Sequence, residues 1–166
     1  MKMNVRHRLS ASPDVAWQEI FSEAYSEAVT VHTGTSSELI SETVKDGKRL
    51  RRSRVTLAKE LPAAAAKVMG SKHLVYTLEE RINDADHTVQ WRVLVDKVSE
   101  KVKASGVFKL VAAGEGCDRI ITGEVTVSVP FIGRKIEAGI AAELEKSYEA
   151  TARFAQAWLT KQAQPL

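Results

Sequence analysis

The feature of this sequence that most constrains its fold is a strand followed at once by one long amphipathic helix. Residues 123–129 alternate in character, as a strand does, and Pro130 ends that strand. From Phe131 to about Leu159 a stripe recurs at three- and four-residue spacing. It consists of Ile132, Ile136, Ile140, Leu144, Tyr148, Thr151, Ala155, Trp158 and Leu159. A helix of this length spans roughly 40 Å, so only a broad, curved sheet can cover it.

The composition is that of one globular domain with a substantial core. The chain has 166 residues, of which 44% are hydrophobic and 27% charged. We expect residues 1–162 to form a single domain and residues 163–166 a loose tail. The first residues are too charged for a signal peptide, and no stretch is long enough to span a membrane. Cys117 is the only cysteine, so no intramolecular disulfide can form, and a cytoplasmic location is the simplest expectation.

Basic residues are concentrated in one stretch. The net charge is only +3, yet Lys45–Arg54 holds six basic residues in ten positions. A site for nucleic acid would need aromatic residues among these charges or a recognition helix, and the sequence has neither. We therefore predict a solvated hairpin around Asp46-Gly47, with charges that discourage edge-to-edge pairing, and no nucleic-acid partner.

Alternation between apolar and polar residues predicts six further strands. They span 3–9, 37–44, 49–57, 74–82, 89–95 and 102–112. Ser12-Pro13-Asp14 starts a short helix after the first strand, residues 22–30 form a possible second one, and Pro62 opens a brief helical turn. Hairpin-connected strands with separate helices predict an α+β fold with an antiparallel sheet covered on one face.

The order of these elements resembles the helix-grip fold of the START and Bet v 1-like (SRPBCC) superfamily. Residues 5–17, with Ser12-Pro13-Asp14 followed by Trp17, resemble its first strand and first helix start. Residues 127–137, with Pro130 and Gly133, resemble the entry to the last helix in the bacterial family DUF2505. The resemblance implies seven curved strands wrapped on the helix, with a cavity between them for lipids, sterols, polyketides or other apolar molecules.

The side chains expected to face that cavity are candidate ligand-binding residues. They are Tyr76, Leu78, Trp91, Val93, Ala104, Gly106, Phe108, Leu110, Val125, Val127, Ile136, Ile140, Leu144 and Tyr148. Ala104, Gly106 and Gly123 are expected to leave space beside wide aromatic walls. The alternative is that the same residues fill a close-packed core.

The leading hypothesis is binding, transport or sensing of a hydrophobic small molecule or lipid. The alternatives are an enzyme of the polyketide cyclase or dehydratase type, and a protein-interaction module with a packed core.

His7 is expected to face inward, where it could act as a base, although a core or rim histidine whose ring nitrogens are both hydrogen-bonded is more common. Glu80 is expected to reach water near a strand end. Glu137 is expected to interact favourably with the positive, N-terminal end of the helix dipole. The four histidines are scattered, so we expect no metal and no cofactor. The sequence leaves the oligomeric state open.

Overall fold

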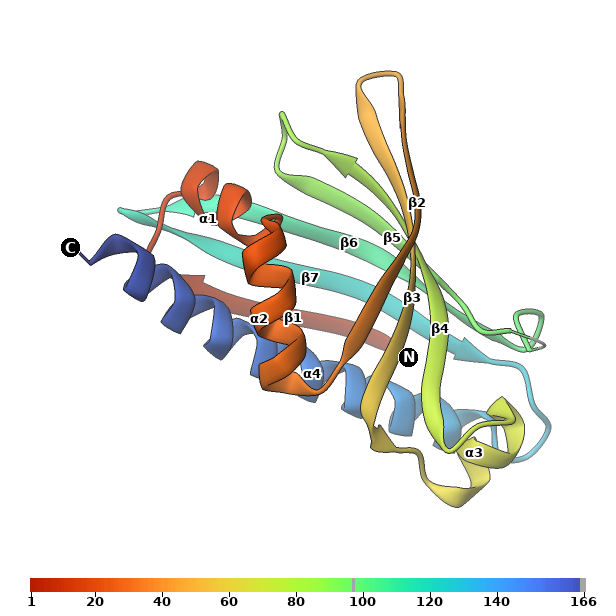
Figure 1. The fold of residues 1–166 in the computed structure, drawn as a ribbon. Coiled ribbons are helices and arrows are strands. Elements are labelled where there is room, and N and C mark those ends of the chain that lie inside the picture. The colour runs from red at the N-terminus through yellow and green to blue at the C-terminus, as the bar shows by residue number, and fades with distance from the viewer. Residues whose placement is uncertain (97, 165–166) are drawn as a thin grey trace.

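The computed structural model describes residues 1–96 and 98–164 and contains one sheet and four helices (Figure 1). The strands are β1 (Lys2–Leu9), β2 (Ser36–Lys45), β3 (Lys48–Glu60), β4 (His73–Asn83), β5 (Thr88–Leu94), β6 (Val102–Ala113) and β7 (Gly116–Val127). The helices are α1 (Pro13–Ile20), α2 (Glu23–Thr33), α3 (Ala63–Met69) and α4 (Gly133–Ala163). The strand order is β1-β7-β6-β5-β4-β3-β2, and all neighbours are antiparallel. The predicted seven-stranded antiparallel sheet is confirmed.

Helix α4 crosses the concave face of the sheet and contacts β1, β7 and α2 (Figure 1). From Ile136 onward the residues of the predicted stripe are buried or, at Tyr148, Thr151 and Trp158, partly buried, whereas Ile132 is exposed. The helix begins at Gly133, two residues later than predicted, because Phe131 takes a left-handed φ of 67° after Pro130. A Cβ at Gly133 would lie 2.5 Å from the Val127 carbonyl oxygen, so the helix and the strand approach each other closely at this glycine. The helix continues to Ala163, the first residue of the predicted tail, and residues 165–166 lie outside the described residues.

The two helices after β1 are set by local caps. Ser12 and Ser22 accept hydrogen bonds from the first-turn N–H groups of Val15 and Tyr25, and Gly34 ends α2 at a φ of 70°. Tyr25 packs against Phe154 and Trp158, with ring centroids 5.6 and 5.8 Å away. This aromatic group, Tyr25, Phe154 and Trp158, joins α2 to the C-terminal half of α4.

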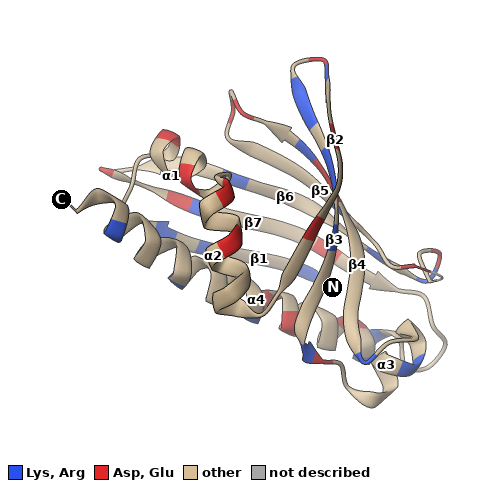
Figure 2. Cartoon of the chain, viewed as in Figure 1, with Lys and Arg blue, Asp and Glu red and all other residues tan. Residues whose placement is uncertain are grey.

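The basic stretch lies in the β2–β3 hairpin at one edge of the sheet, as predicted. Asp46 and Gly47 both have positive φ, which suits a tight two-residue turn. Figure 2 shows acidic residues on the hairpin and on the strands beside it. The arginines form ion pairs with these carboxylates: Arg49 with Glu42 and Asp84, Arg51 with Glu42, Arg52 with Glu79, and Arg54 with Asp96. None of the described helices is both long enough and apolar enough to cross a bilayer.

Candidate functional site

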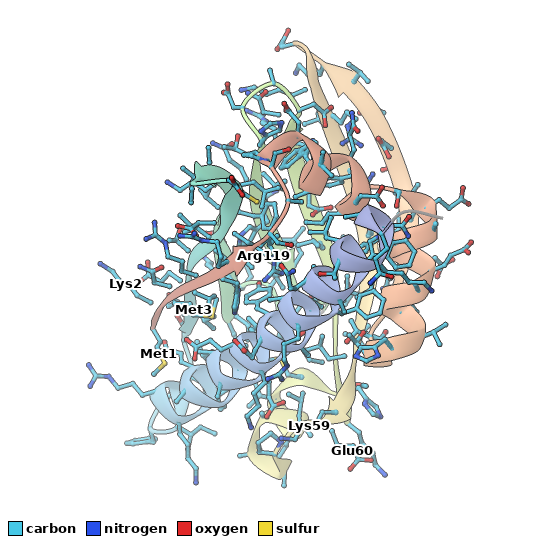
Figure 3. The ribbon with its side chains drawn as sticks, turned by 90° about the vertical axis from the view of Figure 1, so that its left-hand side faces the viewer. Met1, Lys2, Met3, Lys59, Glu60 and Arg119 are labelled. Carbon is cyan, nitrogen blue, oxygen red and sulfur yellow. The ribbon has the colours of Figure 1, made fainter. Side chains whose placement is uncertain are left out.

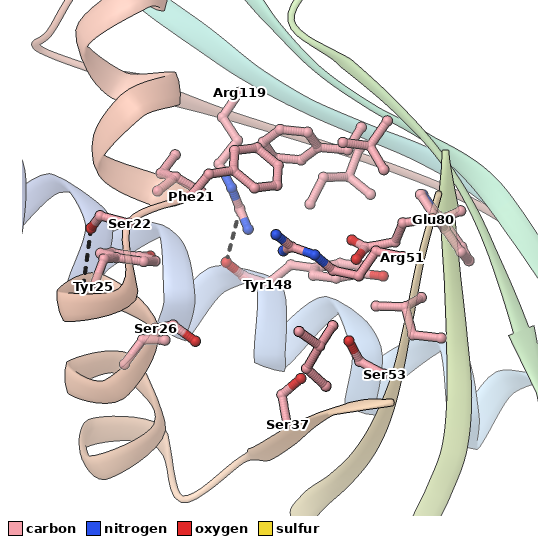
Figure 4. A pocket seen from close by; sticks show the side chains of 18 of the residues that line it. Phe21, Ser22, Tyr25, Ser26, Ser37, Arg51, Ser53, Glu80, Arg119 and Tyr148 are labelled. Carbon is pink, nitrogen blue, oxygen red and sulfur yellow. Dashed lines mark hydrogen bonds between the residues drawn. The ribbon is translucent and has the colours of Figure 1, made fainter. Parts of the chain in front are cut away.

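A cavity of about 600 Å³ lies between the sheet, the α1–α2 segment and α4 (Figure 4). Its volume lies in the range of small-molecule sites. It is lined by Ile20, Phe21, Ser22, Glu23, Tyr25, Ser26, Val29, Ser37, Leu39, Arg51, Ser53, Tyr76, Leu78, Glu80, Val89, Trp91, Val93, Phe108, Arg119, Ile121 and Tyr148. A space of this size shows that the sheet and α4 do not enclose a fully packed core.

Six of the fourteen candidate residues line this cavity, and eight do not. The lining six are Tyr76, Leu78, Trp91, Val93, Phe108 and Tyr148. Seven of the others are buried in the hydrophobic core: Ala104, Leu110, Val125, Val127, Ile136, Ile140 and Leu144. Of the α4 stripe only Tyr148 reaches the cavity. Its earlier members Ile136, Ile140 and Leu144 are 3–4% exposed and are packed into the core.

The eighth residue, Gly106, lies beneath the indole of Trp91. Trp91, Gly106 and Gly123 are direct partners across β5, β6 and β7. A Cβ at Gly106 would lie 2.5 Å from Cζ2 of Trp91, and one at Gly123 would lie 2.6 Å from the same atom. The prediction that these glycines leave space for a ligand is therefore wrong, because the indole already occupies that space.

Arg119 is the most unusual side chain of the cavity wall, and it is not among the residues predicted from the sequence. It extends from β7 into the interior (Figure 3), and the residue is only 8% exposed. The guanidinium donates to the Tyr148 carbonyl (3.2 Å) and the Thr151 hydroxyl (3.1 Å), and lies 3.2 Å from Nδ1 of His7. It also lies 5.7 Å from the ring centroid of Phe108. Burial lowers the pKa of Arg119. Its guanidinium nevertheless stays charged, because arginine is not deprotonated in proteins.

His7 supports Arg119 and does not line the cavity. Its Nε2 lies 2.8 Å from a carboxylate oxygen of Glu149. With a proton on Nε2, Nδ1 accepts from Arg119, so both ring nitrogens have partners. His7 is therefore a hydrogen-bonded rim histidine, which was the preferred interpretation of the sequence over a catalytic base.

Glu80 differs from expectation because it faces the cavity instead of open solvent. It lies on β4 directly opposite Arg51 of β3 and Trp91 of β5, so neighbouring strands cover it on both sides. Burial raises the pKa of the Glu80 carboxyl, against a smaller opposing effect of Arg51 and Arg49. Among the described residues, no ion pair or side-chain hydrogen bond involves this carboxyl.

Two tyrosines complete the polar part of the wall. Burial raises the pKa of Tyr76, and it raises the pKa of Tyr148 to about 12. Both therefore remain protonated at neutral pH and can donate a hydrogen bond. Glu137, in contrast, lies outside the cavity. It accepts the N–H of Val127 at 2.8 Å, which lowers its pKa and ties the start of α4 to β7.

Within residues 1–96 and 98–164, no three His, Cys, Asp or Glu side chains gather closely enough to hold a metal ion. For some of the cavity-lining residues that were not predicted, the sequence does contain a signal. Arg119 shares strand parity with Ile121, and Arg51 and Ser53 share it with buried Val55. The α1–α2 residues had no such signal, because their place over the sheet is set by tertiary packing.

Comparisons with solved structures support the same architecture. A protein from Thermus thermophilus, TTHA0849, matches with a TM-score of 0.70 at 12% identity, over 99% of this chain and 100% of the other. The Zhui aromatase/cyclase from Streptomyces sp. R1128 matches with a TM-score of 0.68 at 13% identity, over 99% and 97%. Ara h 8.0201 matches with a TM-score of 0.64 at 12% identity, over 95% and 98%. At these identities the likeness shows the fold alone, and it confirms the helix-grip architecture of the Bet v 1-like and SRPBCC proteins.

No curated protein sequence matches the chain. One family model does, over residues 4–159, which is nearly the whole sequence. It covers the same strand-to-helix ending and first strand from which the resemblance was inferred. The chain therefore belongs to DUF2505, a family of proteins of unknown function.

Proposed function

We propose that the protein binds a hydrophobic small molecule or lipid in the cavity between the sheet, α2 and α4. The observation that carries the proposal is the cavity itself, about 600 Å³ with a largely apolar and aromatic wall. A close-packed interior would have no such space. One protein of the same fold is an aromatase/cyclase, which supports the idea that this architecture can hold an apolar molecule.

Binding of a neutral apolar fluorophore tests this proposal. N-phenyl-1-naphthylamine should bind the native protein and change the emission of Trp91, which lines the cavity. Leu78→Trp adds bulk to the wall and should weaken binding at least about tenfold, or about 1.4 kcal/mol. Gln90→Trp is the matched control, because Gln90 is exposed on β5 and does not line the cavity. Absence of binding, or equal loss in both variants, would reject the proposal.

A second candidate is acid–base catalysis in the same cavity, of the polyketide cyclase or dehydratase type. The observation that favours it is Glu80, a cavity-facing carboxyl whose pKa is raised by burial, on the same wall as Tyr76 and Tyr148. A carboxyl that keeps its proton above the usual pKa of a glutamate can act as a general acid. Turnover of a reactive polyketide analogue that Glu80→Gln abolishes without weakening binding would support the enzyme. Unchanged turnover in that variant would exclude Glu80 as the acid.

A further inference from the structure

The cavity contains an arrangement of charges that a purely apolar ligand does not use. Arg51 of β3, Glu80 of β4 and Arg119 of β7 all line it. Figure 4 shows these three side chains pointing toward one region beside Tyr148. In an apolar site, a few convergent polar groups fix the orientation of a ligand. The polar region should therefore be the part of the site that selects the chemistry of the ligand.

Arg119 carries a buried positive charge that no described carboxylate contacts directly. The charge of Glu149 acts on it from a distance, and that carboxylate is itself paired with His7. The three hydrogen bonds of Arg119 go to neutral acceptors, and none of the ion pairs between described residues includes it. They leave Nε–H and one Nη2–H without a partner among those residues. A buried charge is costly unless a counter-charge compensates it. Two adjacent guanidinium N–H groups match the two oxygens of a carboxylate.

The other three charged residues of the wall do not supply this counter-charge. Glu23 is exposed in the first turn of α2, and no ion pair between described residues joins it to Arg119. Arg51 has the same sign as Arg119 and is already paired with Glu42 at 3.3 Å. Glu80 can become neutral by taking up a proton, whereas Arg119 cannot lose its charge. The protonated carboxyl of Glu80 would then add a hydrogen-bond donor and remove the repulsion of an incoming anion. The charge balance of the cavity therefore favours an anionic ligand group.

We infer that the ligand is an apolar carboxylic acid, or a molecule with a similarly placed anionic group, and that Arg119 binds this group inside the cavity. This inference rests on the proposed ligand-binding function and deepens it. The apolar body of the ligand lies against Leu78, Val93 and Phe108, and its anionic end meets Arg119 next to Tyr148.

Displacement of bound N-phenyl-1-naphthylamine by decanoate and by decanol tests the inference, because the two competitors share one apolar chain. Decanol is the more hydrophobic of the two, so without recognition of charge it should displace the probe better. We expect decanoate to displace it at a concentration at least about tenfold lower than decanol. Arg119→Met should abolish this preference, whereas Arg153→Met, at an exposed position of α4, should preserve it.

Glu80→Gln keeps the inference testable if Arg119→Met does not fold. In the native protein, decanoate should bind less tightly as the pH rises and Glu80 ionises, because the carboxyl of Glu80 has a raised pKa and the competitor is already ionised at the pH values where this occurs. Glu80→Gln should remove this pH dependence, and decanol should show none in either protein. Equal displacement by the two competitors, or a decanoate preference that survives in Arg119→Met, would overturn the inference. If the fluorophore binds in those experiments, ligand binding itself still stands, whereas absence of fluorophore binding rejects both.

Discussion

Replacement of Gly106 by alanine should destabilise the protein strongly. A Cβ at this position overlaps the backbone oxygen of Thr122 on the paired strand β7, and lies 2.5 Å from Trp91 and 2.7 Å from Cα of Gly123. Two of the three obstacles are backbone atoms, which cannot move without shifting the β6–β7 pairing. Overpacking usually costs about 1–3 kcal/mol, so we expect about 3 kcal/mol here. For a chain of this length, that corresponds to a fall in Tm of about 6–12 °C.

Urea denaturation followed by circular dichroism measures this cost, and Gly139→Ala provides the matched control. Gly139 lies within α4, and a Cβ there meets nothing within 4 Å. Alanine should therefore raise the free energy of unfolding by about 0.5–1 kcal/mol through its higher helix propensity. A Gly106→Ala variant within about 0.5 kcal/mol of the native protein would refute the close packing of Trp91 over the two glycines.

Three further changes test other parts of the structure. Leu144→Asp places an unpaired charge in the core and should lower the free energy of unfolding by at least about 4 kcal/mol. Lys146→Asp, on the exposed face, should change it by about 0.5 kcal/mol or less. Equal melting temperatures of the two variants would contradict the orientation of α4. The pKa of Glu80 is raised above its ordinary value of 4.5, so the folded state loses stability as the pH rises through that raised value. Glu80→Gln should therefore exceed the native protein in stability at pH ~8 and match it below pH ~4, as measured by urea titration. Ser22→Ala removes the cap of α2, where the hydroxyl accepts from Tyr25 N at 3.2 Å, and should lower the free energy of unfolding by about 1 kcal/mol.

The sheet and the last helix could be predicted from the sequence because their signals are local. The alternation over 74–82 became β4 (His73–Asn83), and the stripe from Ile136 onward became the buried face of α4. Alternation every two residues in a strand, or every 3.6 residues in a helix, depends only on which face of the element is buried. Such patterns are present in any fold that covers that face, so these elements can be predicted from the sequence alone.

The cavity wall could be predicted only in part, because periodicity gives the face of a residue but not its position along that face. Ile140 and Tyr148 share one stripe, yet only Tyr148 lines the cavity. Arg119 shares parity with apolar neighbours, but arginine is almost never fully buried without a partner, so its type argues against an interior position. The register that places Trp91 over Gly106 depends on pairing between separate strands, which no local pattern encodes.

The wall of the cavity that α2 forms is held by few buried side chains, and this has a kinetic consequence. Of the eleven residues of α2 only Tyr25 is buried, and it packs on Phe154 and Trp158. Local opening of such an element costs much less free energy than global unfolding. We therefore expect a molecule bound in the cavity to leave when α2 lifts, so that its residence time depends on the aromatic contacts of Tyr25 as well as on its own affinity. Amide hydrogen exchange in α2 should accordingly be faster than in the buried turns of α4 and should slow when the cavity is filled.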